Sequence, residues 1–370
     1  MSNILDYIDW RGDLSLKESP FNEVDSLILS QLSFLDLTGI GEGKNAKKGI
    51  TLRAAVKEVF EKSEGANPVQ GVVMSKDLPI LFRKAAASKR FGNMRFFRYT
   101  AVLDTEVQTQ FAAMCVDLGD KSTYILFRGT DDSIIGWKED LNMMFTEEVP
   151  AQSKAKAYLQ DAAKHIRGKL RVGGHSKGGN LAIYAATYAP VRLQKRIVTI
   201  YNNDGPGFLS RVSDSDAYRR IADKIWTVVP QFAIIGLLLE HNKVDKVVRS
   251  NGEGLWQHDP FNWEVLGNRL VSAGRVSQES LRVERTIRAS LGGLSPEQRK
   301  ELVEAVYKTA TGSGAKNLAD IVAEKMDFVM SLGKLDAQTR KVVFFVGKLL
   351  VREGMRTRTV ESNRKKEKKK

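Results

Sequence analysis

One serine in this sequence stands in a pattern that could carry out chemistry. Residues 174–178 read GHSKG and fit G-x-S-x-G, the pattern of a nucleophilic serine held in a sharp turn between a strand and a helix. Such a turn exposes the Ser176 hydroxyl at a helix N-terminus, where free N–H groups stabilise negative charge. The pattern predicts that Ser176 attacks a carbonyl carbon and that the backbone N–H of Lys177 donates to the resulting oxyanion. A glycine-rich bend without chemistry would look similar, so the other catalytic groups must also be found.

A serine hydroxyl is a weak nucleophile without a base, and the sequence has four histidines. His165 falls in an expected helix. His175 adjoins the serine, and we expect it to be a packed or polar residue at the end of a strand. His241 follows an apolar run and is expected at a helix end, with a catalytic role left open. His258 lies in a loop after the last expected strand and best fits the chain order serine, acid, histidine, so we predict that it is the base.

The acid that would orient this histidine is less well defined. Asp204, Asp223, Glu240 and Asp245 all lie between the serine and the histidine. Asp204 is our candidate because it directly follows an expected strand, at the sheet edge where ligands bind in parallel α/β folds. Its surroundings, NNDGPG, are also typical of an ordinary turn. Asp259, beside the histidine, is expected to cap or bond locally.

A second oxyanion donor is expected at the end of an earlier strand. The segment YILFRGTDD, residues 124–132, ends such a strand. Gly129 permits a close approach of the backbone, and Thr130 offers both an N–H and a hydroxyl group. Thr130 and Lys177 therefore form the predicted oxyanion hole.

The elements that must position these residues follow from the spacing of apolar residues. Strands are expected twice within 111–130, with a turn at 119–122, and once each at 170–174, 196–207, 224–229 and 245–250; helices are expected at 21–37, 153–168, 177–189 and, capped by Ser295, 295–310. Residues 136–145 are expected to be a polar loop. The apolar run 231–241 is expected to be a buried core helix, or else to line an acyl pocket or form part of a lid.

Strands that alternate with helices imply an α/β fold with a mostly parallel sheet flanked by helices. We divide the chain into three segments. Residues 1–105 are expected to form a helical, cap-like segment packed on the core, residues 106–264 the α/β core, and residues 265–370 a basic helical extension with a disordered Lys-rich tail.

The formal net charge of +14 is concentrated after residue 264, where 23 Lys and Arg face 12 Asp and Glu. The last seven residues read RKKEKKK. Such a run is most often a solvated end, and less often it contacts an anionic membrane or nucleic acid. Cys115 is the only cysteine, which excludes an intramolecular disulfide and suits a cytoplasmic location. We expect no signal peptide and no transmembrane segment.

Two stretches resemble a known family. FRGT at 127–130, followed by GGHSKGGNLA, is similar to the class 3 lipases, α/β hydrolases with FRG[TS] before the elbow GHSLGG. The resemblance implies a role for Thr130 in the oxyanion hole and for Ser176 as nucleophile; Lys177 departs from the usual leucine. Over residues 3–265 the chain also resembles an uncharacterised bacterial family of predicted class 3 lipase-like hydrolases, through stretches such as NDGPGF, IIGLLLEH and QHDPFNW.

These observations predict an α/β-hydrolase fold and a serine hydrolase of the lipase or esterase type. Its substrate would be a small acyl ester or a lipid, and no metal or other cofactor is expected. The alternative is a catalytically silent binding or scaffolding protein whose basic C-terminal region engages nucleic acid or an anionic membrane. Reactivity of Ser176 distinguishes the two.

Overall fold

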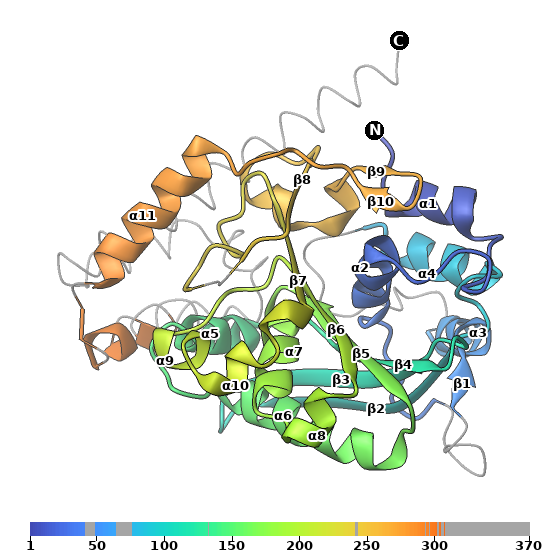
Figure 1. Ribbon diagram of the computed structural model, residues 1–370, viewed down its shortest axis with the longest axis horizontal. Coiled ribbons are helices and arrows are strands. Elements are labelled where there is room, and N and C mark those ends of the chain that lie inside the picture. Colours follow the sequence, from blue (N-terminus) through green and yellow to red (C-terminus); the bar gives the residue numbers. More distant parts are fainter. Residues whose placement is uncertain are drawn as a thin grey trace.

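A computed structural model describes residues 1–40, 49–63, 76–131, 133–240 and 243–292, with several positions between 294 and 307. Its centre is an eight-stranded sheet in the order β1 to β8 (Figure 1). Neighbours from β1 to β4 pair antiparallel, and neighbours from β4 to β8 pair parallel. The strands are β1 Ile50–Thr51, β2 Arg95–Asp104, β3 Thr109–Asp117, β4 Ser122–Phe127, β5 Lys169–His175, β6 Ile197–Asn203, β7 Ile225–Pro230 and β8 Lys246–Val248, with a separate hairpin of β9 Val265–Leu266 and β10 Arg269–Leu270.

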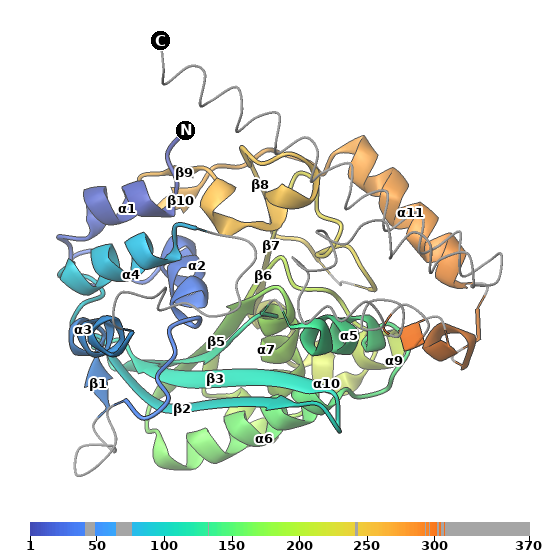
Figure 2. The same ribbon diagram turned by 180° about the vertical axis from the view of Figure 1, so that it is seen from behind.

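Helices cover both faces of the sheet (Figure 2). They are α1 Ile4–Arg11, α2 Glu23–Leu32, α3 Leu52–Lys62, α4 Leu78–Ala87, α5 Ile134–Asn142, α6 Pro150–His165, α7 Lys177–Thr187, α8 Val191–Gln194, α9 Ser210–Ser213, α10 Asp216–Arg219 and α11 Gln278–Gly292, with 3-10 helices η1 Ala222–Lys224, η2 Gly254–His258 and η3 Pro260–Asn262. The expected mostly parallel sheet flanked by helices is confirmed, and the architecture is that of an α/β hydrolase.

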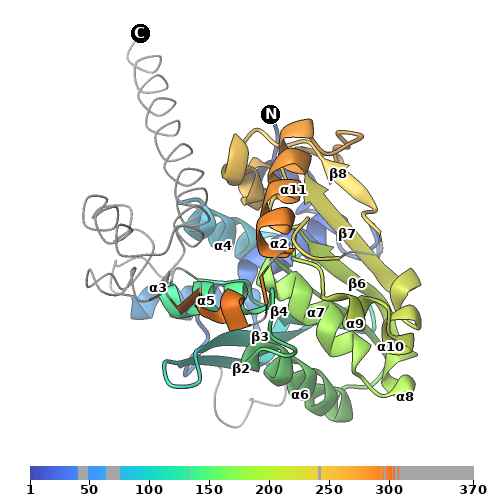
Figure 3. The same ribbon diagram turned by 90° about the vertical axis from the view of Figure 1, so that its left-hand side faces the viewer.

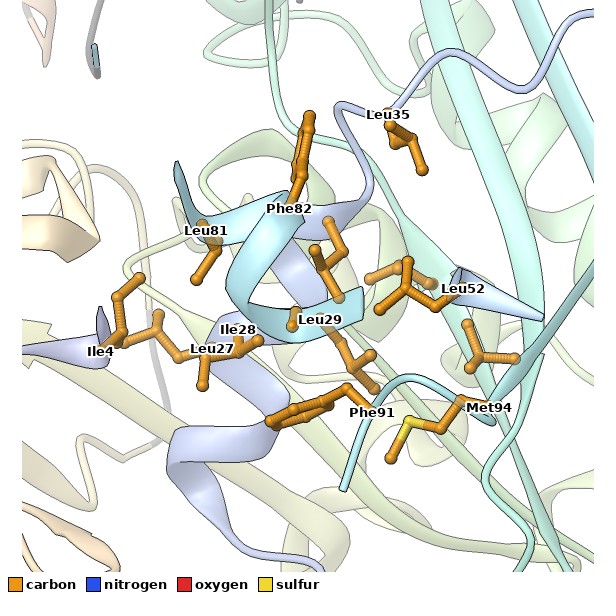
Figure 4. Close-up of a cluster of buried hydrophobic side chains, with 14 of the residues drawn as sticks. Ile4, Leu27, Ile28, Leu29, Leu35, Leu52, Leu81, Phe82, Phe91 and Met94 are labelled. Carbon is orange, nitrogen blue, oxygen red and sulfur yellow. The ribbon is translucent and has the colours of Figure 1, made fainter. Parts of the chain in front are cut away.

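Two hydrophobic cores follow from the alternation of side chains along the strands. On β3, Met114 and Val116 point into the cluster shared with α1 to α4, whereas Ala113 and Cys115 point into the cluster shared with α6 and α7. Figure 4 shows part of the first cluster, built from apolar side chains of α1, α2, α3 and α4. The two cores fix the strands from both sides, so that their carboxyl ends hold the loops in place.

The polar loop expected at residues 136–145 and the core helix considered for residues 231–241 are both wrong, whereas a role of residues 231–241 in an acyl pocket or a lid stays a prediction. Residues 136–145 were expected to form a loop, but most of them belong to α5, because Ser133 caps this helix by accepting a hydrogen bond from Gly136 N at 3.1 Å. Residues 231–240 form turns and bends rather than a helix. Their backbone groups pair with another segment instead, since Phe208 and Glu240 exchange two N–H···O bonds of 3.0 Å.

The first 105 residues contribute two strands, β1 and β2, to the sheet in addition to helices. The boundary predicted at residue 105 lies in the turn between β2 and β3, which pair with each other. The division into three segments stays a prediction.

The C-terminal part begins against the loops at the sheet edge. Just before α11, Ser277 N donates to Gln231 O at 2.7 Å, and in the first turn of α11, Ser280 Oγ accepts from Ala233 N at 3.1 Å. Ser295 caps the following turn as expected, since its Oγ accepts from Gln298 N at 3.2 Å. The Lys-rich tail at 364–370 lies outside the described residues. No helix in the described part of the chain is both long and apolar enough to cross a membrane.

Candidate active site

Ser176 lies in a strained turn between β5 and α7. Its backbone has φ +56° and ψ −131°, a region that side-chain-bearing residues rarely adopt. Ser176 N donates to Asn203 O at 2.9 Å, which anchors the turn to the end of β6. A Cβ at Gly174 or at Gly178 would collide with Phe127 O. Strand β4 therefore passes too close to the elbow for any residue but glycine at these two positions, and the half-buried serine is held at the carboxyl end of β5.

The end of β4 lies directly beside the elbow. A Cβ at Gly129 would be 2.8 Å from His175 O and 3.5 Å from Ser176 Cβ, so Thr130, the next residue, follows at the site. Neither Thr130 N nor Lys177 N makes a hydrogen bond to another residue that the structure describes. These two N–H groups are the ones predicted for the oxyanion hole, and both stay available as donors.

His258 and Asp204 are 54 residues apart in the sequence, but His258 Nδ1 lies 2.6 Å from Asp204 Oδ2. Asp204 directly follows β6, and its N–H donates to Val228 O at 2.7 Å. Its φ of +52° turns the chain away from the sheet, a conformation that aspartate tolerates better than most residues. His258 ends the 3-10 helix η2. The structure thus unites the predicted acid and the predicted base at the sheet edge that carries Ser176.

Burial shapes the ionisation of this pair. It raises the pKa of Asp204 well above its usual range, an effect opposed by the backbone N–H of Gly236, which approaches the carboxylate without making a full hydrogen bond. Burial also lowers the pKa of His258 to about 4. His258 is therefore neutral at pH 7, and when Asp204 is ionised the bond between them keeps the imidazole hydrogen on Nδ1. Nε2 is left unprotonated as a hydrogen-bond acceptor.

The other candidates lie elsewhere. Glu240 Oε2 accepts from Ser213 Oγ at 3.3 Å, and Asp245 Oδ2 accepts from Thr227 N at 2.9 Å. Asp223 lies in η1, at the start of β7, and His165 is exposed at the end of α6. Asp259 bonds locally as expected, since its Oδ1 accepts from Phe261 N at 3.0 Å. His241 lies outside the described residues.

His175 is a buried residue at the end of β5, as expected, but its contact with His258 was not foreseen. His175 Nε2–H donates to the backbone carbonyl of His258 at 2.9 Å, and the two rings are 4.5 Å apart. Burial and the neighbouring His258 hold the pKa of His175 well below its usual range. The neutral ring therefore fastens the loop that carries His258 to β5. These two residues are 83 positions apart, so no local pattern could reveal the contact.

Sequence reasoning also missed the partners of the Lys177 side chain. Lys177 Nζ lies 3.0 Å from Glu139 Oε2 and 3.6 Å from Asp140 Oδ1. Both acids are on α5, beside the start of α7 (Figure 3). Because residues 136–145 were expected to form a polar loop, their acids were not considered as partners. A cap signal, Ser133 ahead of apolar Ile134 and Ile135, is present in the sequence.

Two hollows in the described surface are lined by residues other than Ser176. One, of about 560 Å³, is lined by Phe21, Tyr201, Trp226 and Lys246 among others, and opens where β7 and β8 begin. The other, of about 10 Å³, lies beside α7. Among the described residues, no group of three or more His, Cys, Asp or Glu is placed to hold a metal ion. The candidate site is therefore located by side-chain geometry and not by a cavity.

A family model described as Mbeg1-like matches residues 85–308. The chain belongs to the Mbeg1-like family. Every residue of the candidate site, from Thr130 to His258, lies inside the matched region of this Mbeg1-like chain. Among solved structures, a crystal structure of M37 lipase is similar, with 15% identity, a TM-score of 0.40, and coverage of 74% of this chain and 82% of that chain. No curated protein sequence matches this Mbeg1-like protein significantly.

Proposed function

We propose that this protein is a serine hydrolase of the lipase or esterase type, which cleaves acyl esters through an acyl-enzyme on Ser176. The observation that carries the proposal is the 2.6 Å bond between His258 Nδ1 and Asp204 Oδ2. A buried Asp–His pair beside a serine in a strained elbow is what nucleophilic catalysis by serine requires.

In the proposed reaction, Ser176 Oγ attacks the ester carbonyl carbon while His258 Nε2 takes the hydroxyl proton. The N–H groups of Thr130 and Lys177 donate to the oxyanion of the tetrahedral intermediate. His258 then passes the proton to the leaving alcohol, and the carbon–oxygen bond of the ester breaks. Water, deprotonated by His258, then attacks the acyl carbon. The bond from that carbon to Ser176 Oγ breaks, His258 returns the proton to Ser176 Oγ, and the carboxylic acid is released. Asp204 holds the imidazole in the tautomer that these transfers need.

With a pKa of about 4, His258 is neutral at pH 7, so that its Nε2 is free to accept the proton of Ser176. Within the described structure Ser176 Oγ makes no hydrogen bond with His258. The proposal therefore requires that these two groups approach when substrate binds, as catalytic hydrogen bonds tighten in the reacting complex.

A fluorophosphonate probe tests the proposal, because it phosphonylates an activated serine and releases fluoride. We expect the purified wild type to be labelled and the Ser176→Ala and His258→Ala variants to be unlabelled. His165→Ala is a matched control, since His165 is exposed and distant in sequence from the predicted catalytic groups; it should be labelled at the wild-type rate. Labelling that persists in Ser176→Ala would assign the reactivity to another residue.

Esters of p-nitrophenol with acyl chains of graded length then define the substrate class. A screen of this kind separates a preference for short acyl esters from a preference for long lipid-like chains, by comparing kcat/KM along the series. If the probe labels the wild type but the wild type hydrolyses none of these esters, the substrate contains an acyl bond of another kind.

The scaffolding alternative depends on the basic tail, which lies outside the described residues. Deleting residues 356–370 separates the two ideas. We expect ester hydrolysis to survive this truncation, whereas loss of all activity from a folded core would make the tail a necessary element. Contact of the tail with an anionic membrane or nucleic acid, and a cytoplasmic location, stay predictions.

A further inference from the structure

We propose that the buried ammonium group of Lys177 positions the oxyanion hole, by holding Asp140 on α5 so that Asp140 in turn holds Thr130. The inference rests on the proposed hydrolase function and adds a positioning residue to it. Lys177 would thus act twice: its N–H donates to the oxyanion, and its side chain orders the partner donor.

The Lys177 side chain is enclosed. It is 1% exposed, and Glu139, its partner at 3.0 Å, is 0% exposed. Burying an ammonium group lowers the stability of the fold unless the group is paired. Packing alone therefore does not explain a lysine beside the nucleophile. Leucine or methionine would fill similar space without that cost.

Glu139 is fixed from several directions. Its two oxygens accept from Thr109 Oγ1 at 2.8 Å, Gln110 N at 3.0 Å and Ala151 N at 2.8 Å, as well as from Lys177. These bonds tie α5 to β3 and to the start of α6. Glu139 therefore serves as the anchor, and Asp140, the next residue, is the carboxylate that faces the oxyanion hole.

Asp140 connects the lysine to Thr130. Asp140 Oδ2 accepts from Thr130 Oγ1 at 2.5 Å, while its other oxygen, Oδ1, is 3.6 Å from Lys177 Nζ and has no hydrogen-bond partner among the described residues. An ionised carboxylate can only accept, so the Thr130 hydroxyl must point toward it. This bond restrains the residue whose N–H is needed in the oxyanion hole.

The charge of Asp140 depends on Lys177. Burial raises the pKa of Asp140 to about 6, and the nearby ammonium group opposes that rise while Glu139 adds to it. Removing the ammonium leaves the carboxylates of the buried Glu139 and the partly buried Asp140 without their shared cation and raises the pKa of Asp140 further. A protonated Asp140 could donate instead of accept, and Thr130 would lose its fixed orientation.

The test compares Lys177→Met with Lys246→Met as a matched control. Lys246 also forms a partly buried ion pair, with Glu23, but it lies in β8 away from the elbow. We expect Lys177→Met to lower kcat for a p-nitrophenyl ester at least tenfold with little change in KM, since one oxyanion donor is worth about 10²–10³-fold in kcat. The acid limb of its kcat–pH profile should also move to higher pH. Lys246→Met should keep wild-type kcat and the wild-type profile.

An Asp140→Asn background separates positioning from a general loss of structure. If Lys177 acts through Asp140, adding Lys177→Met to Asp140→Asn should change kcat less than twofold. Where Lys177→Met does not fold because Glu139 is left unpaired, the Lys177→Met/Glu139→Gln double variant removes both charges and takes its place.

Each result has one meaning. With wild type active and Ser176→Ala inactive, two results would overturn the positioning role. The first is that Lys177→Met has the same kcat and pH profile as Lys246→Met. The second is that the losses from Lys177→Met and Asp140→Asn multiply in the double variant. A folded wild type without labelling or hydrolysis would instead overturn the proposed function, and this inference with it.

Discussion

At the scale of single residues, the candidate site depends on which atom carries which hydrogen. An ionised Asp204 fixes the His258 tautomer by accepting from Nδ1. The His175 ring holds the His258 backbone by its bond to the His258 carbonyl. Ser176, His258, Asp204, Thr130 and Lys177 were all predicted from residue types and chain order. The positioning contacts of His175, Glu139 and Asp140 were not predicted. His175 contacts His258 from 83 positions away, and Glu139 contacts Lys177 from 38 positions away. Glu139 and Asp140 also belong to a segment that was expected to be a loop.

Asp204→Asn tests the tautomer directly. Asparagine keeps the shape of the side chain, but its NH2 group can donate to Nδ1 and so favour the hydrogen on Nε2. We expect kcat to fall about 10³–10⁴-fold, as expected when the imidazole presents the wrong tautomer, with thermal stability near that of wild type. Steady-state ester kinetics with a thermal melt measure both quantities. Asp245→Asn is a control at the other candidate acid, and an equal loss there would contradict the assignment of Asp204.

The pH dependence of activity should show two steps on its acid side. A base works only when it is neutral, so activity falls as the pH drops through the pKa of His258, about 4. Protonation of Asp140, with a pKa of about 6, should cause an earlier and partial loss. The kcat–pH profile between pH 3 and 8 should therefore lose its upper step in Asp140→Asn and keep its lower one. A single step near the ordinary histidine pKa would contradict this prediction.

At the scale of elements, the strand–turn–helix at residues 169–187 could be predicted because the information is local. Glycines permit the close approach of β4 to the elbow, and apolar runs mark β5 and α7. In the two segments whose structure was predicted wrongly, contacts with distant residues determine the structure. In α5 the polar residues Lys138 and Glu139 are buried with partners from distant segments, so an apolar periodicity does not describe them. In residues 231–240 the backbone bonds to residues 207 and 208 override an apolar run.

Gly178→Ala tests the close contact of β4 with the elbow. A methyl group there collides with the backbone of Phe127, and a backbone obstacle cannot rotate away. We expect a lower melting temperature together with loss of probe labelling, because the Ser176 turn must shift. Gly267→Ala is the comparison: its φ is +62°, but no atom lies within 4 Å of the added Cβ. That variant should lose about 1 kcal/mol of stability from backbone strain and keep its labelling rate.

At the scale of the whole molecule, the helices α1, α2 and α4 complete the core on one face of the sheet (Figures 1 and 4). Sequence patterns predicted the helix at α2 but not the contacts that hold this layer together. One such contact is a buried ion pair between Arg90 and Asp25, whose side chains are both 0% exposed. Arg90 also donates to the carbonyls of Leu14 and Ser19, and Tyr7 OH donates to Asp25 at 2.9 Å. The partners are 65 residues apart, which is why composition and periodicity could not pair them.

Arg90→Met should therefore destabilise the fold without altering the chemistry. The change leaves the Asp25 carboxylate buried without its cation, which costs about 3–5 kcal/mol of unfolding free energy, measured by urea denaturation. Arg90 contacts none of the proposed catalytic groups, so the rate of probe labelling per folded molecule should equal that of wild type.

Lys89→Met is the neighbouring control, because Lys89 pairs with Glu18 on the surface, where solvent screens the interaction. This variant should leave the urea midpoint nearly unchanged. Equal shifts in the two variants would mean that burial of the ion pair does not set its contribution. A slower labelling rate in folded Arg90→Met would mean that the helical layer also holds the elbow in its reactive geometry.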